Sequence, residues 1–121
     1  MQKYDLIIVG AGAAGMLAAI QANAEAPQLR IALLERLPRP GKKLLATGNG
    51  RCNIANAAAS REHYYNAAGQ NPAFVQPALQ KYTQQDNLAF FRSMGLLTKQ
   101  DSEGKMYPIG DKYVAVMYNF P

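Results

Sequence analysis

The chain has 121 residues, of which 49% are hydrophobic and 17% are charged. This composition provides enough apolar side chains for a folded core and argues against a disordered chain, while the length excludes a redox enzyme with separate, complete cofactor and substrate domains. The formal net charge of +5 suits an anionic partner, but the sequence shows none of the motifs or basic–aromatic patterns of nucleic-acid-binding proteins, so no nucleic-acid partner is expected.

Disulfide, metal and membrane chemistry are not expected either. Cys52 is the only cysteine and His63 the only histidine, which excludes an intramolecular disulfide and a zinc site built from such ligands. A reducing, cytoplasmic setting follows as the default. The uncharged stretch Leu6–Ile20 leaves a secretory signal peptide as an alternative. However, Asp5 offsets Lys3, and the stretch is shorter than the roughly 20 residues that span a bilayer, so no membrane partner is expected.

The first part of the chain has the pattern of a βαβ unit, over residues 1–36. Tyr4–Val9 is an apolar, β-branched run that predicts a fully buried strand of a parallel sheet. A glycine-rich turn follows, and then Met16–Ala24 is rich in alanine and leucine and predicts a helix that ends before Pro27. Leu29–Leu34 predicts a second buried strand. The fold class is therefore α/β.

Residues 37–56 predict a loop with one short helical turn, because prolines and glycines interrupt them. Residues 57–70 are polar and alanine-rich and give no assignment. Residues 57–121 as a whole are expected to hold helices and a hairpin. Asn71 and Pro72 are suited to the N-cap and first position of a helix, which Pro77 is expected to kink or restart.

A second helix is predicted over Thr83–Met94. Thr83 is the expected N-cap with Asp86 three residues later, and Gly95 is the expected C-terminal cap. Leu88, Phe91 and Met94 are spaced for one apolar face, with Phe90 beside it. Residues 96–100 and 105–109 then predict a hairpin across the turn at 101–104.

The clearest chemical signal is the spacing Gly10-x-Gly12-x-x-Gly15, with Ala13 and Ala14 inside it. In this pattern the first glycine allows a tight turn, the second lets a pyrophosphate approach the backbone, and the third lets the helix pack closely on the sheet. The helix N-terminus then offers free N–H groups to phosphate oxygens. The motif is specific here because it lies between a predicted strand and a predicted helix.

Glu35 extends this signal, because it ends the second predicted strand twenty residues after Gly15. An acid at this place accepts hydrogen bonds from ribose hydroxyls and disfavours a 2′-phosphate. The residues therefore predict a dinucleotide site for FAD or NAD rather than NADP. In isolation, Glu35 would be read as an exposed carboxylate at a strand end.

The segment after the second strand distinguishes between these cofactors. Residues 41–56 resemble the G-(R/K)-K-x-x-x-(S/T)-G-x-G-R-C-N-x-(T/S)-N string of the YhiN/BaiN-type NAD(P)/FAD-dependent oxidoreductases, also described as aminoacetone-oxidase-family flavoproteins. Ala55 departs from the string, and the tail 113–121 fits the family poorly. The matching residues are Gly41, Lys42, Lys43, Thr47, Gly48, Gly50, Arg51, Cys52, Asn53 and Asn56.

The resemblance implies an FAD-dependent oxidoreductase with a glutathione-reductase-like Rossmann domain, of which residues 1–121 would be an incomplete N-terminal part. It implies that residues 10–15 hold the pyrophosphate, that Glu35 and Arg36 bind the adenosine side, and that residues 37–56 form a flavin-approach loop. NAD(P)H is a candidate electron donor. The loop residues assigned to the cofactor are Lys42, Lys43, Gly48, Asn49, Gly50, Arg51, Cys52 and Asn53.

Several alternatives stay open at this point. The chain could be a stand-alone NAD- or ADP-type nucleotide-binding module without redox chemistry, or the product of a truncated reading frame. Cys52 could place a thiol near the flavin or could be a small buried apolar residue, and the second reading is favoured. The sequence assigns no catalytic residue, no particular small-molecule substrate and no oligomeric state.

Overall fold

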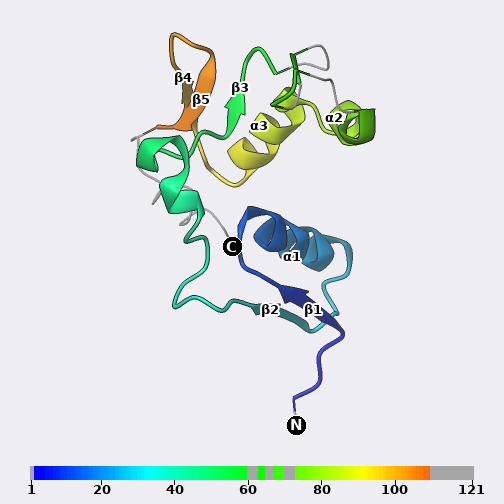
Figure 1. Cartoon of the computed structure of the whole chain (residues 1–121). Coiled ribbons are helices and arrows are strands. Elements are labelled where there is room, and N and C mark those ends of the chain that lie inside the picture. Colours follow the sequence, from blue (N-terminus) through cyan, green and yellow to red (C-terminus); the bar gives the residue numbers. More distant parts are fainter. Residues whose placement is uncertain (1, 60–62, 65–66, 70–72, 110–121) are drawn as a thin grey trace.

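The computed structural model describes residues 2–59, 63–64, 67–69 and 73–109, and it confirms the α/β class (Figure 1). Strands β1 (Leu6–Val9) and β2 (Ile31–Leu34) pair in parallel, with Leu6 opposite Ile31 and Val9 opposite Leu34. Helix α1 (Ala13–Glu25) connects them and packs against both strands. The N-terminal part is therefore the predicted βαβ unit, with shorter strands and a helix that begins earlier.

The prediction that both strands are fully buried is wrong. Val9 is 83% exposed, Ile7 is 56% exposed and Leu34 is 51% exposed. The three side chains share one face of the sheet, because side chains alternate along a strand and Val9 pairs with Leu34. Helix α1 covers only the opposite face, and within the described part of the chain no other element covers these residues (Figure 1).

The later part of the chain forms a second, antiparallel sheet in the order β3–β5–β4. Strands β4 (Thr98–Gln100) and β5 (Lys105–Pro108) form the predicted hairpin, and β3 (Ala55–Asn56) pairs with the other edge of β5. The strand at Ala55–Asn56 corrects the expectation that residues 37–56 form a loop with one short helical turn and no strand. A two-residue strand carries almost no local signal, since its partner lies about fifty residues later.

The first helical segments of this region are short. The helical turn expected in the loop is the 3₁₀ segment η1 (Leu44–Gly50). The 3₁₀ turn η3 (Ala73–Val75) leads into α2 (Gln76–Lys81), whose first turn contains Pro77, so the helix restarts there as predicted. The expected start at residues 71–72 lies outside the described residues.

Helix α3 (Gln84–Ser93) begins with a capping box. The Thr83 hydroxyl accepts from the Asp86 N–H, and the Asp86 carboxylate accepts from the Thr83 N–H at 2.8 Å. Gly95, with φ of +84°, follows the end of the helix in the left-handed conformation. Both predicted caps are confirmed.

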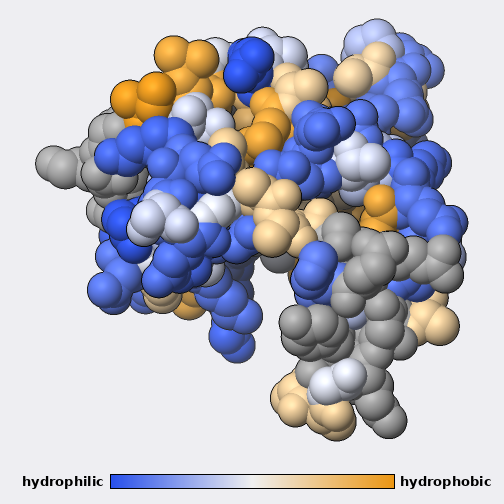
Figure 2. All heavy atoms as spheres, turned by 90° about the horizontal axis from the view of Figure 1, so that it is seen from above, coloured by the Kyte–Doolittle hydropathy of each residue, from blue (hydrophilic) through white to orange (hydrophobic). Residues whose placement is uncertain are grey.

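The densest packing lies in this second region. Cys52 and Leu96 are buried together, with partly buried Leu44, Ile54 and Phe91 against them. Tyr107 is 3% exposed, and Pro108 beside it is fully buried. Figure 2 shows that the surface over the hairpin and helices is mostly hydrophilic, with scattered apolar groups. Of the described helices, none combines the length and apolar composition that crossing a membrane requires.

Candidate functional site

The turn between β1 and α1 has the geometry that its glycine spacing predicts. Gly10 has φ of +98°, a conformation that favours glycine, and its N–H donates to the Leu34 carbonyl at 2.7 Å. A Cβ atom on Gly15 would lie 1.9 Å from the Gly10 oxygen, so only glycine fits there without movement. A Cβ atom on Gly12 would have no neighbour within 4 Å. Gly15 therefore serves packing, whereas the space at Gly12 is open to a ligand.

Within the described part of the chain, the N-terminus of α1 faces this open space with unused donors. Gly12 is the N-cap, and the Met16 N–H makes the bond to the Gly12 carbonyl at 3.0 Å. The preceding N–H groups of the first turn have no acceptor inside the helix. Ala13 and Ala14 are exposed, and the first turn contains no acidic side chain that would occupy the donors. This arrangement can bind an anionic group such as a phosphate.

Glu35 lies at the end of β2 and joins this turn directly. Its Oε2 accepts from the Ala11 N–H at 2.9 Å, and its Oε1 accepts from the Leu37 N–H at 2.8 Å. These backbone donors, with Leu37 the stronger, hold the pKa of the carboxyl below its ordinary value. Each carboxylate oxygen keeps a further acceptor site, so Glu35 can also accept from a ligand hydroxyl.

The loop that follows is attached to the same turn. The Gly41 N–H donates to the Ala11 carbonyl at 2.7 Å, so Ala11 binds both Glu35 and the start of the loop. The structure thus brings the glycine turn, Glu35 and Gly41 together. Arg36, Lys42 and Lys43 are exposed, and in the described part of the chain no hydrogen bond or ion pair fixes their side chains at the turn.

Residues 48–53 form a strained backbone segment. Gly48, Asn49, Gly50 and Cys52 all have positive φ, between 54° and 83°. A positive φ raises the conformational energy of residues that have a side chain, here Asn49 and Cys52. Backbone strain of this kind is concentrated at functional sites. A Cβ atom on Gly48 would lie 2.7 Å from the Asn53 nitrogen, so this glycine is required by space as well as by conformation. The Asn49 and Asn53 side chains are exposed.

The Arg51 side chain contacts Tyr107, which lies near the C-terminal end of the described chain. Its Nε donates to the Gly48 carbonyl at 3.3 Å, and its Nη2 donates to the Tyr107 hydroxyl at 3.3 Å. The guanidinium carbon lies 4.2 Å from the centre of the Tyr107 ring. The sequence assigned no role to Tyr107, which lies in the second strand of the predicted hairpin.

Cys52 packs as an apolar residue in this structure. Its thiol is free and the residue is 5% exposed, against Leu96. This agrees with the favoured reading of Cys52 as a small buried side chain. No group of metal-ligating side chains occurs among the residues that the structure describes.

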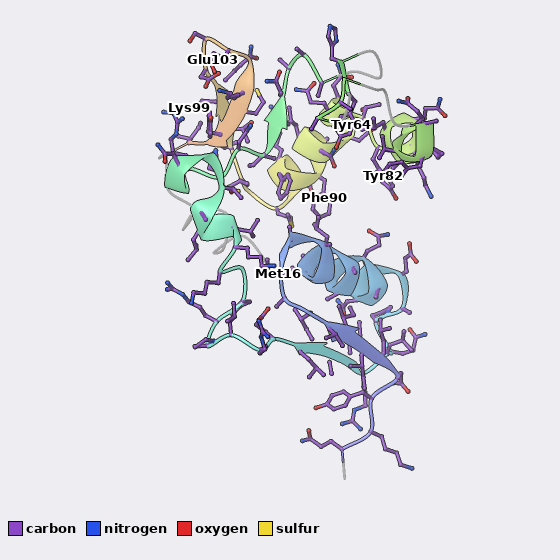
Figure 3. All side chains as sticks on the ribbon, in the orientation of Figure 1. Met16, Tyr64, Tyr82, Phe90, Lys99 and Glu103 are labelled. Carbon is purple, nitrogen blue, oxygen red and sulfur yellow. The ribbon has the colours of Figure 1, made fainter. Side chains whose placement is uncertain are left out.

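A separate groove of about 780 Å³ lies between β3 and helices α2 and α3. Asn53 is the one predicted cofactor residue that lines it, together with amide side chains such as Gln80 and Gln84 and the rings of Tyr64 and Tyr82. Figure 3 shows the two tyrosines near α2 and the N-terminal end of α3. The groove does not include the glycine turn.

Comparison with known proteins identifies a family and several relatives. Residues 4–120 match the family model described as the HI0933-like protein Rossmann domain. The chain is 39% identical over 110 residues to the 3-dehydro-bile acid delta(4,6)-reductase of Clostridium scindens, covering 91% of this chain and 26% of the relative. It is 34% identical over 107 residues to the ribosomal RNA dihydrouridine synthase of Escherichia coli, covering 88% of this chain and 26% of the relative. The chain thus spans about a quarter of the length of these relatives.

Proposed function

Because the chain belongs to the HI0933-like Rossmann domain family, the family of FAD-binding flavoproteins that its motifs resemble, we propose that it binds FAD as part of a flavin-dependent oxidoreductase. One contrast carries the proposal. A side chain at Gly15 would collide with the Gly10 oxygen, whereas a side chain at Gly12 would enter empty space in front of the α1 N-terminus. The pyrophosphate fits this space, where free N–H groups meet its charge.

Glu35 is proposed to bind the adenosine ribose. The carboxylate is ionised over a wide pH range because the Ala11 and Leu37 N–H groups lower its pKa. Ala11 is part of the glycine turn, so the Glu35 carboxylate stabilises the turn through its bond to the Ala11 N–H. In the proposal the same carboxylate also accepts hydrogen bonds from the ribose hydroxyls. Arg36, Lys42 and Lys43 are proposed to add positive charge near the adenine and the phosphates.

Residues 48–53 are proposed to approach the flavin side of FAD. Bound flavin would supply hydride transfer, while this chain supplies binding, orientation and charge. The guanidinium of Arg51 offers positive charge to the pyrophosphate or to reduced flavin. NAD(P)H as electron donor is part of the proposal and rests on the family resemblance alone.

The substrate stays open. The names of the two relatives refer to a bile acid derivative and to ribosomal RNA, which are unrelated molecules. The expectation of a small-molecule substrate and no nucleic-acid partner therefore stays a prediction for this chain. The competing function, an NAD- or ADP-type binding module without redox chemistry, uses the same turn and Glu35 but makes no use of residues 48–53.

A visible-absorbance experiment tests the proposal. The purified chain is mixed with FAD, desalted and scanned, with Gly12→Val as the matched variant. The proposal predicts a flavin band that stays with the wild-type chain and is lost from Gly12→Val, because the valine occupies the pyrophosphate space. Complete separation of FAD from the wild-type chain would contradict FAD binding by this chain. Equal retention by both proteins would contradict the phosphate-turn assignment.

A further inference from the structure

We propose that Tyr107 is a positioning residue that holds Arg51 in the orientation in which its guanidinium meets the negative charge of the bound cofactor. This inference rests on the proposed function, since it names what sets the position of one proposed cofactor residue. The two residues are separated by more than fifty positions in the sequence and meet only in the folded chain.

The contact between them has two parts. The ring of Tyr107 lies under the guanidinium, with 4.2 Å between the ring centre and the Arg51 Cζ. The hydroxyl of the same ring accepts from Nη2 at 3.3 Å. Stacking restricts the plane of the guanidinium, and the hydrogen bond restricts its rotation within that plane.

Tyr107 is itself fixed. It is 3% exposed and lies on β5, the central strand of the second sheet, where it pairs with Lys99 on β4. The ring also lies close to Gly48, the first residue of the strained segment 48–53, because a Cβ atom added to this glycine would be 3.2 Å from Cε1 of Tyr107. Tyr107 therefore connects a rigid strand to a strained loop.

The donors of Arg51 are only partly used by these contacts. Nε donates to the Gly48 carbonyl and Nη2 donates to Tyr107, and a guanidinium carries five N–H groups. Among the described residues, no hydrogen bond uses the remaining three. A part-buried guanidinium held from two sides, with donors left over, suits an anionic group that approaches the outer edge of the loop.

A double-mutant cycle on FAD affinity tests this role. The four proteins are wild type, Tyr107→Leu, Arg51→Ala and the double variant, each titrated with FAD by flavin fluorescence. Tyr107→Leu is expected to weaken binding roughly threefold to tenfold, the range of a lost cation–π contact and hydrogen bond. If Tyr107 acts through Arg51, the same substitution changes affinity little when Arg51 is already alanine.

A merely structural role gives a different result, because a general loosening of the fold would weaken FAD binding equally in both backgrounds. That outcome overturns the proposal. Tyr107→Phe is the conservative variant: it keeps the ring and loses the hydroxyl, so its affinity is expected to lie between wild type and Tyr107→Leu. The proposal is also overturned if Tyr107→Phe and Tyr107→Leu both bind FAD with the affinity of the wild type.

A cofactor-independent measurement separates this proposal from the proposed function. Hydrogen exchange is followed at the amides of Arg51 and Cys52, which donate to the Gly48 and Thr47 carbonyls. Tyr107→Leu is expected to speed this exchange while Tyr107→Phe leaves it near wild type. If wild type binds no FAD, the proposed function fails, and unchanged exchange in Tyr107→Leu then rejects the positioning role on its own.

Discussion

The βαβ unit at residues 2–36 and the antiparallel region at residues 41–109 obtain their geometry in different ways. In the first, a turn is shaped by the absence of side chains, and the sheet beside it leaves Val9 83% exposed. In the second, a loop is shaped by buried side chains, with Cys52 at 5% and Tyr107 at 3% exposure. The local geometry therefore depends on backbone conformation in the first region and on long-range packing in the second.

A backbone hydrogen bond joins the two regions. The Gly41 N–H donates to the Ala11 carbonyl, so the loop of the second region begins at the turn of the first. Figure 1 shows the βαβ unit and the antiparallel sheet as neighbouring parts, with η1 between them along the chain.

The largest expected effect on stability comes from the core of the second region. Leu96→Ala removes a side chain that is 3% exposed, so the free energy of unfolding is expected to fall by about 2–5 kcal/mol in urea titrations. The neighbouring Leu97 is 57% exposed, and Leu97→Ala is expected to cost about 0.5 kcal/mol or less. Similar losses for the two variants would show that the core has been placed wrongly.

A matched pair of glycine substitutions tests the first region through the free energy of unfolding. A Cβ atom on Gly15 meets the Gly10 oxygen at 1.9 Å, so Gly15→Ala is expected to lower the free energy of unfolding by about 1–3 kcal/mol. Gly12→Ala meets no atom within 4 Å and is expected to change it by about 0.5 kcal/mol or less. The reverse order, measured by urea denaturation, would refute the separate roles of the two glycines.

The capping box of α3 gives a smaller effect. Thr83→Ala removes the hydroxyl that accepts from the Asp86 N–H and is expected to cost about 1 kcal/mol. Thr83→Ser keeps a hydroxyl and is the matched control, with a loss of only a few tenths of a kcal/mol expected. Thermal unfolding followed by circular dichroism measures the stability of both variants. An equal loss of stability in the two would show that the hydroxyl cap does not cause the effect of Thr83→Ala.

The smallest effect is a pH dependence carried by Glu35. Its pKa in the folded chain lies below the ordinary value of 4.5, because the carboxylate accepts from the Leu37 and Ala11 N–H groups. Its contribution to stability is therefore present above pH 4.5 and is lost as the pH falls through the lower, folded-state pKa. Asp86 also has a lowered pKa and adds to the same trend.

Comparison with Glu35→Gln isolates this contribution. Urea midpoints measured from neutral pH downward are expected to fall less steeply for Glu35→Gln than for wild type. Identical pH profiles for the two proteins would mean that the carboxylate bonds to the turn do not contribute to folding.

The parts of the structure that depend on local residue type could be predicted from the sequence. The turn at Gly10–Gly15, the cap at Thr83 and the hairpin up to Pro108 depend on short-range backbone preferences, and the structure confirms them. The exposed face of β1 could not be predicted, because an apolar run has the same appearance whether or not a second layer covers it.

The contacts that escaped prediction are those between distant segments. The pairing of Ala55–Asn56 with β5 and the stacking of Arg51 on Tyr107 each join residues about fifty positions apart. No local pattern encodes such a contact. Similarly, the predicted acceptor role of Glu35 toward ribose gave no indication that its carboxylate also binds the Ala11 N–H.

The most direct test of the central claim is an amide NMR titration of the chain with ADP and, separately, with FAD. The proposed function predicts that ADP shifts the signals of Gly10–Gly15 and Glu35, and that FAD shifts these and also residues 48–53. Shifts that appear only around the groove at Gln80 and Gln84, with the glycine turn unchanged by both ligands, would contradict it.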